Sequence, residues 1–145
     1  MPNRLIDSQI SQNASTANAI SIPASSTPAL FGTLGLNTAA AGANLSVHFT
    51  ATVTLSAVVA ILVPVTVTIF RVVGATSTPV YSATKTLPVG TLLLTTDVIT
   101  VTGADLLTTN PGFVEYQAFV SIPSGLAVIP NRVGPESFEA VAYSD

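Results

Sequence analysis

The clearest pattern in the chain is a regular alternation of apolar and polar residues from Asn44 to Leu55. Successive side chains of a β-strand point to opposite faces, so this alternation predicts a strand with one buried face. The segment Val65–Val72 is rich in β-branched residues and predicts another strand. The run Ala57–Val63 is apolar at every position. It predicts a strand that is buried on one face by its own core and on the other by a partner subunit.

Further short strands are predicted between turn residues in the second half of the chain. They span Val80–Leu87, Val98–Thr102, Phe113–Ile122, Leu126–Ile129 and Ser137–Tyr143. No segment repeats apolar residues at helical spacing, so the predicted fold class is all-β, with a jelly-roll sandwich as the architecture. The positions expected to form the core or the trimer-forming strand faces are Val47, Phe49, Val53, Ile61, Val63, Phe70, Phe119 and Tyr143.

The first thirty residues differ in composition from the rest. They are rich in polar residues, carry Pro23 and Pro28 near their end, and hold only isolated aliphatic residues. Such a segment cannot build a core of its own. It is interpreted either as a disordered tail or as an arm that becomes ordered on a neighbouring subunit. We predict a connector arm over residues 1–30 and a jelly-roll domain over 31–145. The anchors expected in the arm are Leu5, Ile6, Ile10, Ile20 and Ile22.

Charge is scarce and unevenly distributed. Only 8% of the 145 residues are charged, against about 25% in a typical globular protein. No Asp, Glu, Lys or Arg occurs between Asp7 and Arg71. A long uncharged β-rich segment aggregates unless its partners are specified, which favours specified self-assembly. The net charge of −3 and only four cations give no basic face for nucleic acid.

The sequence offers little for catalysis, cofactors or metals. It has no cysteine, which excludes disulfides and thiolate chemistry. His48 is the only histidine, and no nucleophile elbow or oxyanion-hole motif accompanies it, so a contact between subunits is favoured over a catalytic triad. We expect no enzymatic activity and no cofactor. We also expect no classical secretory signal and no membrane insertion, because the longest apolar run is far shorter than a membrane helix.

The acidic residues allow two structural interpretations. Asp97 and Asp105 flank a predicted strand, and their spacing favours solvated loop charges over a calcium site. Glu136 and Glu139 beside Arg132 predict a salt-bridged edge near the C-terminus. Pairing of these carboxylates with cations of another subunit, Arg71 or Lys85, stays open.

Three segments resemble a known family. They are Val65–Arg71, Asn110–Phe119 and Arg132–Asp145. They are similar to the trimeric, tumour-necrosis-factor/C1q-like jelly rolls of spore-surface proteins in spore-forming bacilli. Examples are the head domain of the collagen-like exosporium glycoprotein and the subunits of fibrillar endospore appendages. The chain has no Gly-X-Y repeat and no cysteine, so the fibrillar appendage subunit is the closer match.

The resemblance implies a structural role outside the cell. The protein would be a homotrimer on the spore surface, polymerised head-to-tail by its N-terminal arms into a pilus-like exosporium appendage. Its partners would be copies of itself, a spore-surface anchor protein and a tip protein. The alternative is a trimeric receptor- or carbohydrate-binding head at the tip of a spore filament or a phage fibre.

Overall fold

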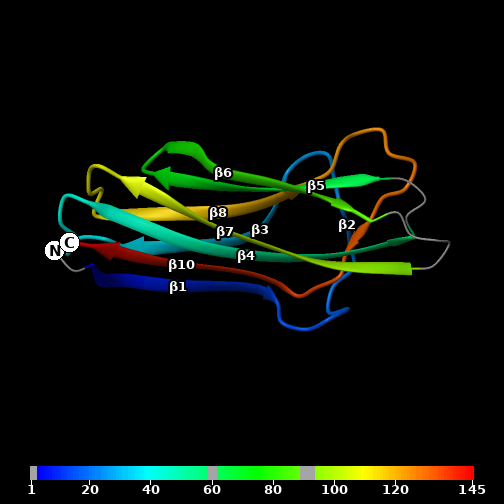
Figure 1. The fold of residues 1–145 in the computed structure, drawn as a ribbon, viewed down its shortest axis with the longest axis horizontal. Helices are drawn as coiled ribbons and strands as arrows, with labels where there is room; N and C mark the ends of the chain where they lie inside the picture. Colours follow the sequence, from blue (N-terminus) through cyan, green and yellow to red (C-terminus); the bar gives the residue numbers. More distant parts are fainter. Residues whose placement is uncertain (1–2, 59–61, 89–93) are drawn as a thin grey trace.

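The protein is an antiparallel β-sandwich without helices in the part of the chain that the computed structural model describes, residues 3–58, 62–88 and 94–145 (Figure 1). Sheet A contains, in spatial order, β1 (Arg4–Ala14), β10 (Glu136–Ser144), β4 (Leu45–Val58) and β7 (Leu94–Leu107). The short strands β9 (Asn131–Arg132) and β2 (Ile22–Pro23) continue this sheet beside the end of β4. Sheet B contains β3 (Ala29–Asn37), β8 (Phe113–Ser121), β5 (Val63–Val73) and β6 (Thr76–Leu87). No described residue belongs to a helix that could cross a membrane.

The order of the eight long strands is that of a jelly roll. Consecutive strands mostly alternate between the sheets, so that β10 returns between β1 and β4 while β8 returns between β3 and β5. This arrangement of two interlocked Greek keys defines the jelly-roll sandwich. The predicted fold class is confirmed.

The core lies between the two sheets and is built from alternate residues of the central strands. Along β4, Val47, Phe49 and Val53 are buried, as the alternation predicts, and Val63 is buried at the start of β5. Tyr116 of β8 is also fully buried. These residues therefore fill the interior of one subunit.

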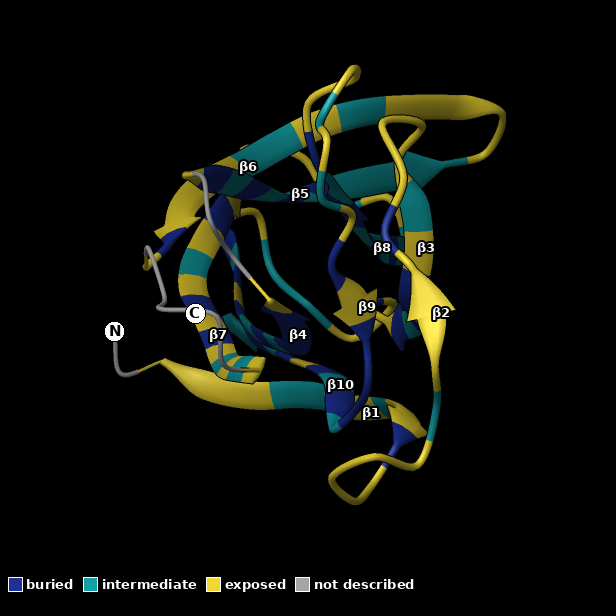
Figure 2. Ribbon diagram, turned by 90° about the vertical axis from the view of Figure 1, so that its right-hand side faces the viewer, coloured by how far each residue is buried: buried dark blue, intermediate teal, exposed yellow. Residues whose placement is uncertain are grey.

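The predicted division between an arm over residues 1–30 and a separate body is not confirmed. Residues 4–14 are the first strand of the jelly roll, paired with β10 of the same chain along their whole length. Ile22 pairs with Arg132, which ties the following segment to the same sheet. Strand pairing uses backbone groups, so it needs no apolar repeat in the sequence. Figure 2 shows β1 at the margin of the sandwich, coloured mostly as exposed.

One predicted strand is a loop, one predicted strand is only partly described, and the strands β1, β2, β3 and β9 were not predicted. Of the apolar run Ala57–Val63, the residues Ala57 and Val58 end β4, and Val63 begins β5 in the other sheet. Val58 and Leu62 are exposed, and residues 59–61, with Ile61, lie outside the described residues. Leu126–Ile129 is a loop whose Leu126 and Val128 pack against the core. Strand β3 was not predicted, because a register shift after Leu30 interrupts the alternation of inward and outward residues along it.

Candidate assembly surface

The outer face of sheet A is the surface with the most unusual chemistry. Residues paired across β1, β10, β4 and β7 point to the same side of the sheet. Four such rows form this face, and each row takes one residue from every strand. They are Leu5, Tyr143, Ser46 and Leu106; Ser8, Val141, His48 and Ala104; Ile10, Glu139, Thr50 and Thr102; and Gln12, Ser137, Thr52 and Thr100.

This outer face is apolar at one end and hydroxyl-rich at the other. Leu5 and Leu106 of the first row are 61% and 75% exposed, and Ile10 of the third row is 69% exposed. Beside them, the rings of His48 and Tyr143 meet edge to face with their centroids 5.4 Å apart. Towards the other end, the hydroxyls of paired threonines on β4 and β7 are joined by a hydrogen bond of 3.0 Å. Glu139 is the only carboxylate among the sixteen residues of the four rows.

In strand β1 exposed aliphatic residues face outward and polar residues face the inner side of the sheet, unlike in the central strands. Its outward positions include the exposed aliphatic residues Leu5 and Ile10, whereas Asp7, Gln9 and Ser11 share the inner side of the sheet with buried residues of β10. Asp7 and Ser11 do not enter the core. Their side-chain oxygens accept hydrogen bonds from backbone N–H groups of β3, at 2.8 and 3.2 Å. The strand thus presents Leu5 and Ile10 to solvent.

The outer face of sheet B is also almost uncharged. Pairs of hydroxyls from β5 and β6 hydrogen-bond across the strands, as for Thr66 and Thr84 at 2.8 Å. Phe70 and Phe119 form an edge-to-face pair with centroids 5.3 Å apart. Both rings are half-buried on this face, so they lie outside the core of the subunit.

The few charged residues mostly pair within the chain. Lys85 of β6 reaches Asp97 of β7 at 2.9 Å, and Arg71 of β5 reaches Asp105 of β7 at 2.8 Å. The prediction of solvated loop charges at the two aspartates is wrong, because both lie within β7 and face a cation. Pairing of the C-terminal glutamates with cations of another subunit is likewise not supported, since Arg71 and Lys85 have partners within the same chain.

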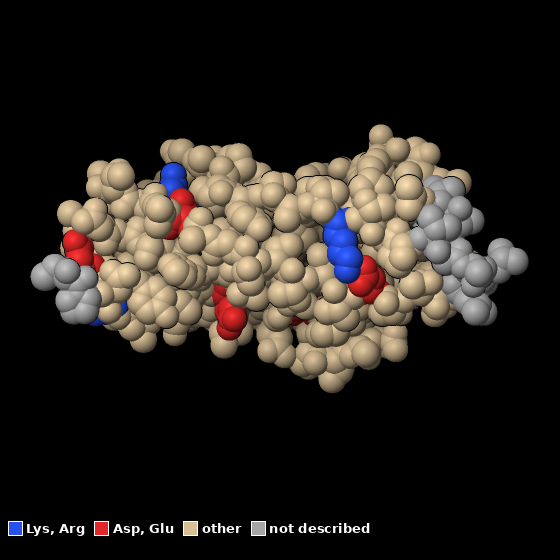
Figure 3. All heavy atoms as spheres, in the orientation of Figure 1, with Lys and Arg blue, Asp and Glu red and all other residues tan. Residues whose placement is uncertain are grey.

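The described residues contain no group of three or more acidic or histidine ligands that could hold a metal. On the face drawn in Figure 3, charged atoms form a few small clusters between wide uncharged areas.

Arg71 and Asp105 form a cluster with Tyr116 between the two sheets. Nη1 of Arg71 donates to both carboxylate oxygens at 2.9 and 2.8 Å, and the Tyr116 hydroxyl donates to Oδ2 at 2.8 Å. Burial first, and the hydrogen bond to Asp105 second, raise the pKa of Tyr116 far above its ordinary value of 10.0. The phenol therefore stays protonated and holds the carboxylate in place.

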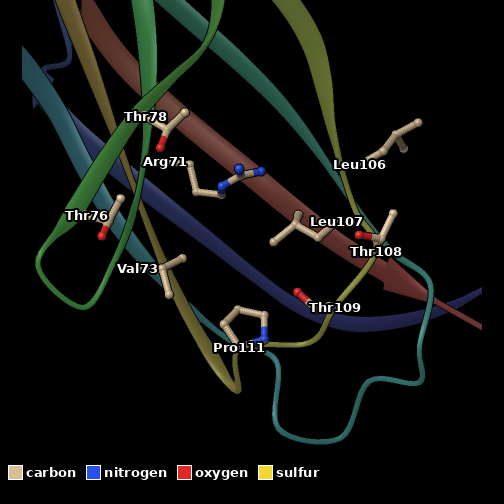
Figure 4. Close-up of a pocket in the computed structure, with 9 residues that line it drawn as sticks. All are labelled: Arg71, Val73, Thr76, Thr78, Leu106, Leu107, Thr108, Thr109 and Pro111. Atoms are coloured by element: carbon tan, nitrogen blue, oxygen red, sulfur yellow. The ribbon is translucent and has the colours of Figure 1, made fainter.

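A small surface hollow of about 250 Å³ adjoins this cluster. Figure 4 shows Arg71 reaching into it from β5, with threonine hydroxyls and Leu107 around the opening. Such a hollow could hydrogen-bond a sugar or an anion. However, Asp105 already neutralises the guanidinium, so the site has little attraction left for a free anion.

A third ion pair lies at the other end of the sandwich. Arg132 makes two hydrogen bonds to Glu136, from Nε at 2.7 Å and from Nη2 at 2.6 Å, and both side chains are buried. Nδ2 of Asn13 on β1 donates a third bond to Oε1 of Glu136 at 2.8 Å. The predicted edge involving Arg132 and Glu136 is thus an interior ion pair, while Glu139 stays exposed on the outer face of sheet A. Nothing in the sequence predicted the hydrogen bond from Asn13 to this ion pair.

The structure separates the predicted site residues into three groups. Val47, Phe49, Val53 and Val63 are core residues and unavailable for contacts between subunits. Phe70, Phe119 and Tyr143 lie on the outer faces, where another subunit could reach them. Of the predicted arm anchors, Leu5, Ile10 and Ile22 are exposed, while Ile6 and Ile20 are half-buried. The alternate aliphatic residues of β7, Leu94, Val98 and Leu106, were overlooked, although their exposure follows from their spacing with the outward threonines.

No protein-family model matches this sequence, and no curated protein matches it significantly. The resemblance to spore-surface jelly rolls therefore rests on the three segments of the sequence that carry it, and the strand order shows the jelly-roll fold alone.

Proposed function

We propose that the protein is a non-enzymatic structural subunit that assembles with copies of itself into an extracellular fibre on the spore surface. The observation that carries the proposal is the outer face of sheet A. There, exposed aliphatic residues from the two edge strands flank His48 and Tyr143, and Glu139 is the one carboxylate among the sixteen residues of the four rows.

Physical chemistry favours a partner on this face. A soluble monomer rarely exposes a contiguous apolar patch without a binding role, and it usually keeps charges on its surface to prevent association. Strand β1 places Leu5 and Ile10 outward while its polar side chains face β3. This inverted pattern is costly for a solitary molecule and favourable once a second subunit covers the face.

The proposed assembly is a homotrimer that polymerises further. Contacts between the outer faces of sheet A would close a trimer, in keeping with the resemblance to trimeric jelly rolls. In a closed trimer every contact of the ring is already made, so a fibre needs another contact, in which the donor and acceptor surfaces differ. The N-terminal segment is the proposed donor, because it is the segment whose own side chains contribute least to the core. The spore-surface location and the anchor and tip partners belong to the same proposal.

The proposal assigns no catalytic role to His48. A catalytic histidine needs a carboxylate that orients it, yet this exposed ring contacts Tyr143 and makes no hydrogen bond to a described carboxylate. Its place on the outer face of sheet A suits a contact between subunits.

Negative-stain electron microscopy of the purified protein, together with sedimentation velocity, tests the proposal. We expect filaments from the wild type, and smaller species from a Leu106→Glu variant that folds normally by circular dichroism. Ile129→Glu is the matched control, because Ile129 is also exposed, at 46%, but lies in the loop between β8 and β9, outside the four rows of this face. A wild-type protein that stays monomeric would refute the proposal. Discrete trimers that bind glycans would favour the alternative, a terminal recognition head.

A further inference from the structure

We propose that β1 is an exchangeable strand, which leaves β10 of its own chain and pairs with β10 of the next copy. This inference rests on the proposed function and specifies its growing contact. The partner is a second copy of this chain, the donated element is residues 4–14, and the acceptor is the edge of β10 together with the neighbouring edge of β3.

The first argument is that β1 is held by backbone pairing and polar contacts and hardly at all by apolar packing. Of its eleven residues only Ala14 is buried, and Ile6 packs partly against the core. The ladder with β10 nevertheless runs from Arg4 opposite Ser144 to Ala14 opposite Glu136. Removal of β1 would therefore leave the apolar core nearly intact but would expose a whole row of backbone donors and acceptors on β10. An edge of this kind is a template for another strand.

The second argument is that the polar contacts of β1 fix its register and can be reproduced by another copy. Asn13 donates to Glu136, Asp7 and Ser11 accept from backbone N–H groups of β3, and Arg4 donates to the carbonyl of Ala40. The acceptor groove thus recognises the strand at four positions along its length. None of these contacts depends on which chain supplies β1.

The third argument is the turn that leads back from β1. Ala19 N–H donates to the carbonyl of Thr16 at 3.3 Å, and Asn18 has a φ of 61°, in the left-handed region. Asparagine tolerates this conformation better than most residues, but only glycine adopts it freely. If residues 15–21 extend, they span roughly 20 Å and carry β1 away from its own body. A short strained hinge of this kind favours strand exchange.

Exchange in one direction produces a polymer. Each subunit then donates β1 at one surface and accepts β1 at another, and such a heterologous contact does not close on itself unless the geometry forms a ring. The total number of strand pairings is the same as in the closed monomer. The equilibrium between the closed monomer and the exchanged polymer is therefore set by the conformation of residues 15–21 and by the additional surface that neighbouring subunits cover.

Mixed disulfides test the exchange directly, because the chain has no cysteine. Ser8 is paired with Val141 across β1 and β10. Cross-strand Cα atoms lie about 4.5–5.5 Å apart, within the range that a disulfide needs. A Ser8→Cys chain carrying a mass tag is refolded with an untagged Val141→Cys chain and then oxidised. We expect a tagged–untagged disulfide dimer, and none when the untagged chain carries Thr84→Cys on sheet B instead. Absence of the first dimer would overturn the exchange.

A locked chain provides the second test. The double variant Ser8→Cys/Val141→Cys, oxidised while monomeric, keeps β1 on its own β10 and should form no filaments, and reduction should restore them. Filaments from the oxidised protein would refute the exchange and leave the proposed function standing. A wild type without filaments would refute the proposed function, whereas the mixed disulfide would still report exchange in small oligomers.

The hinge provides the third test. Asn18→Gly relieves the left-handed residue and should slow the appearance of the mixed disulfide. Asn18→Val opposes the closed turn and should raise the exchanged fraction about fivefold or more. Equal exchange in both variants would contradict the assigned role of the turn.

Discussion

Nδ2 of Asn13 donates a 2.8 Å hydrogen bond to Oε1 of Glu136, and this bond connects the first strand of the jelly roll to a buried ion pair. Glu136 is fully buried and also receives two hydrogen bonds from Arg132, whose side chain is almost fully buried. Burial of a charge is tolerated when it is paired and hydrogen-bonded. The Asn13 amide meets this requirement from β1, so the edge strand takes part in satisfying the interior.

This ion pair leads to a stability prediction. Glu136→Leu should lower the free energy of unfolding by about 3–5 kcal/mol, because it leaves the Arg132 guanidinium buried without its partner. Adding Arg132→Met should restore most of the loss, since two apolar side chains can replace a buried pair. Urea unfolding at a concentration where the protein is monomeric measures both effects.

Glu139 provides the control for that prediction. It lies on the same strand but is exposed, so Glu139→Gln should change stability by no more than about 0.5 kcal/mol. A Glu136→Leu variant as stable as the wild type would show that the pair contributes little.

Two glycines of β3 lead to a second prediction. A Cβ at Gly32 would lie 2.5 Å from Cβ of Phe138, an atom fixed next to the backbone of β10. Gly32→Ala should therefore cost about 1–3 kcal/mol or more in unfolding free energy. At Gly35 the added atom would meet the tip of the Phe113 ring, which is 57% exposed and free to turn away. Gly35→Ala should stay within about 1 kcal/mol of the wild type. Thermal or urea unfolding of the two variants measures both effects. Equal losses of unfolding free energy in the two variants would contradict this account.

The strands that the sequence predicts are those whose inner face meets the core. In β4 the alternation is imposed by burial of Val47, Phe49 and Val53, so periodicity finds the strand. Apart from Ile6, strand β1 directs mostly polar residues inward and places Leu5 and Ile10 outward, the reverse of the rule on which such prediction depends. Its pairing partner lies more than a hundred residues away, and nothing local indicates it. The fold class was therefore predictable, whereas the place of β1 was not.

The candidate site was predictable only in its general character. Scarce charge predicted a weakly charged outer surface, and the four rows on the outer face of sheet A carry one carboxylate, Glu139, among their sixteen residues. That other subunits cover this face is our proposal. The pairing of Asp105 with Arg71 and Tyr116 could not be foreseen, because it joins three strands from both sheets. The aspartates consequently looked like loop charges when considered along the chain alone.

The chemistry of the outer face of sheet A leads to a third prediction, on salt. Contacts between uncharged faces and backbone edges are not screened, whereas ion pairs between subunits weaken as the Debye length shortens from roughly 20 Å at about 0.02 M to roughly 4 Å at about 0.5 M. Filament mass in a sedimentation assay should therefore stay constant or rise over this range. Filaments that dissolve at high salt would indicate that charged residues such as Glu139 hold the subunits together.

The buried phenol of Tyr116 leads to a prediction on alkaline pH. Its pKa is raised in the folded protein above the value of 10.0 that an unfolded chain would show, so the unfolded state loses a proton first as the pH rises. The stabilisation is complete below pH 10 and is lost progressively above it, at up to about 1.4 kcal/mol per pH unit for this one group. Urea unfolding between pH 8 and pH 11.5 should show this decline. In Tyr116→Phe the unfolding free energy should fall less steeply with pH, by the contribution of one proton. At pH 7 the variant should be less stable than the wild type by about 1–3 kcal/mol, because Asp105 loses a hydrogen-bond donor. Equal alkaline slopes in the two proteins would show that Tyr116 ionises freely in the folded state.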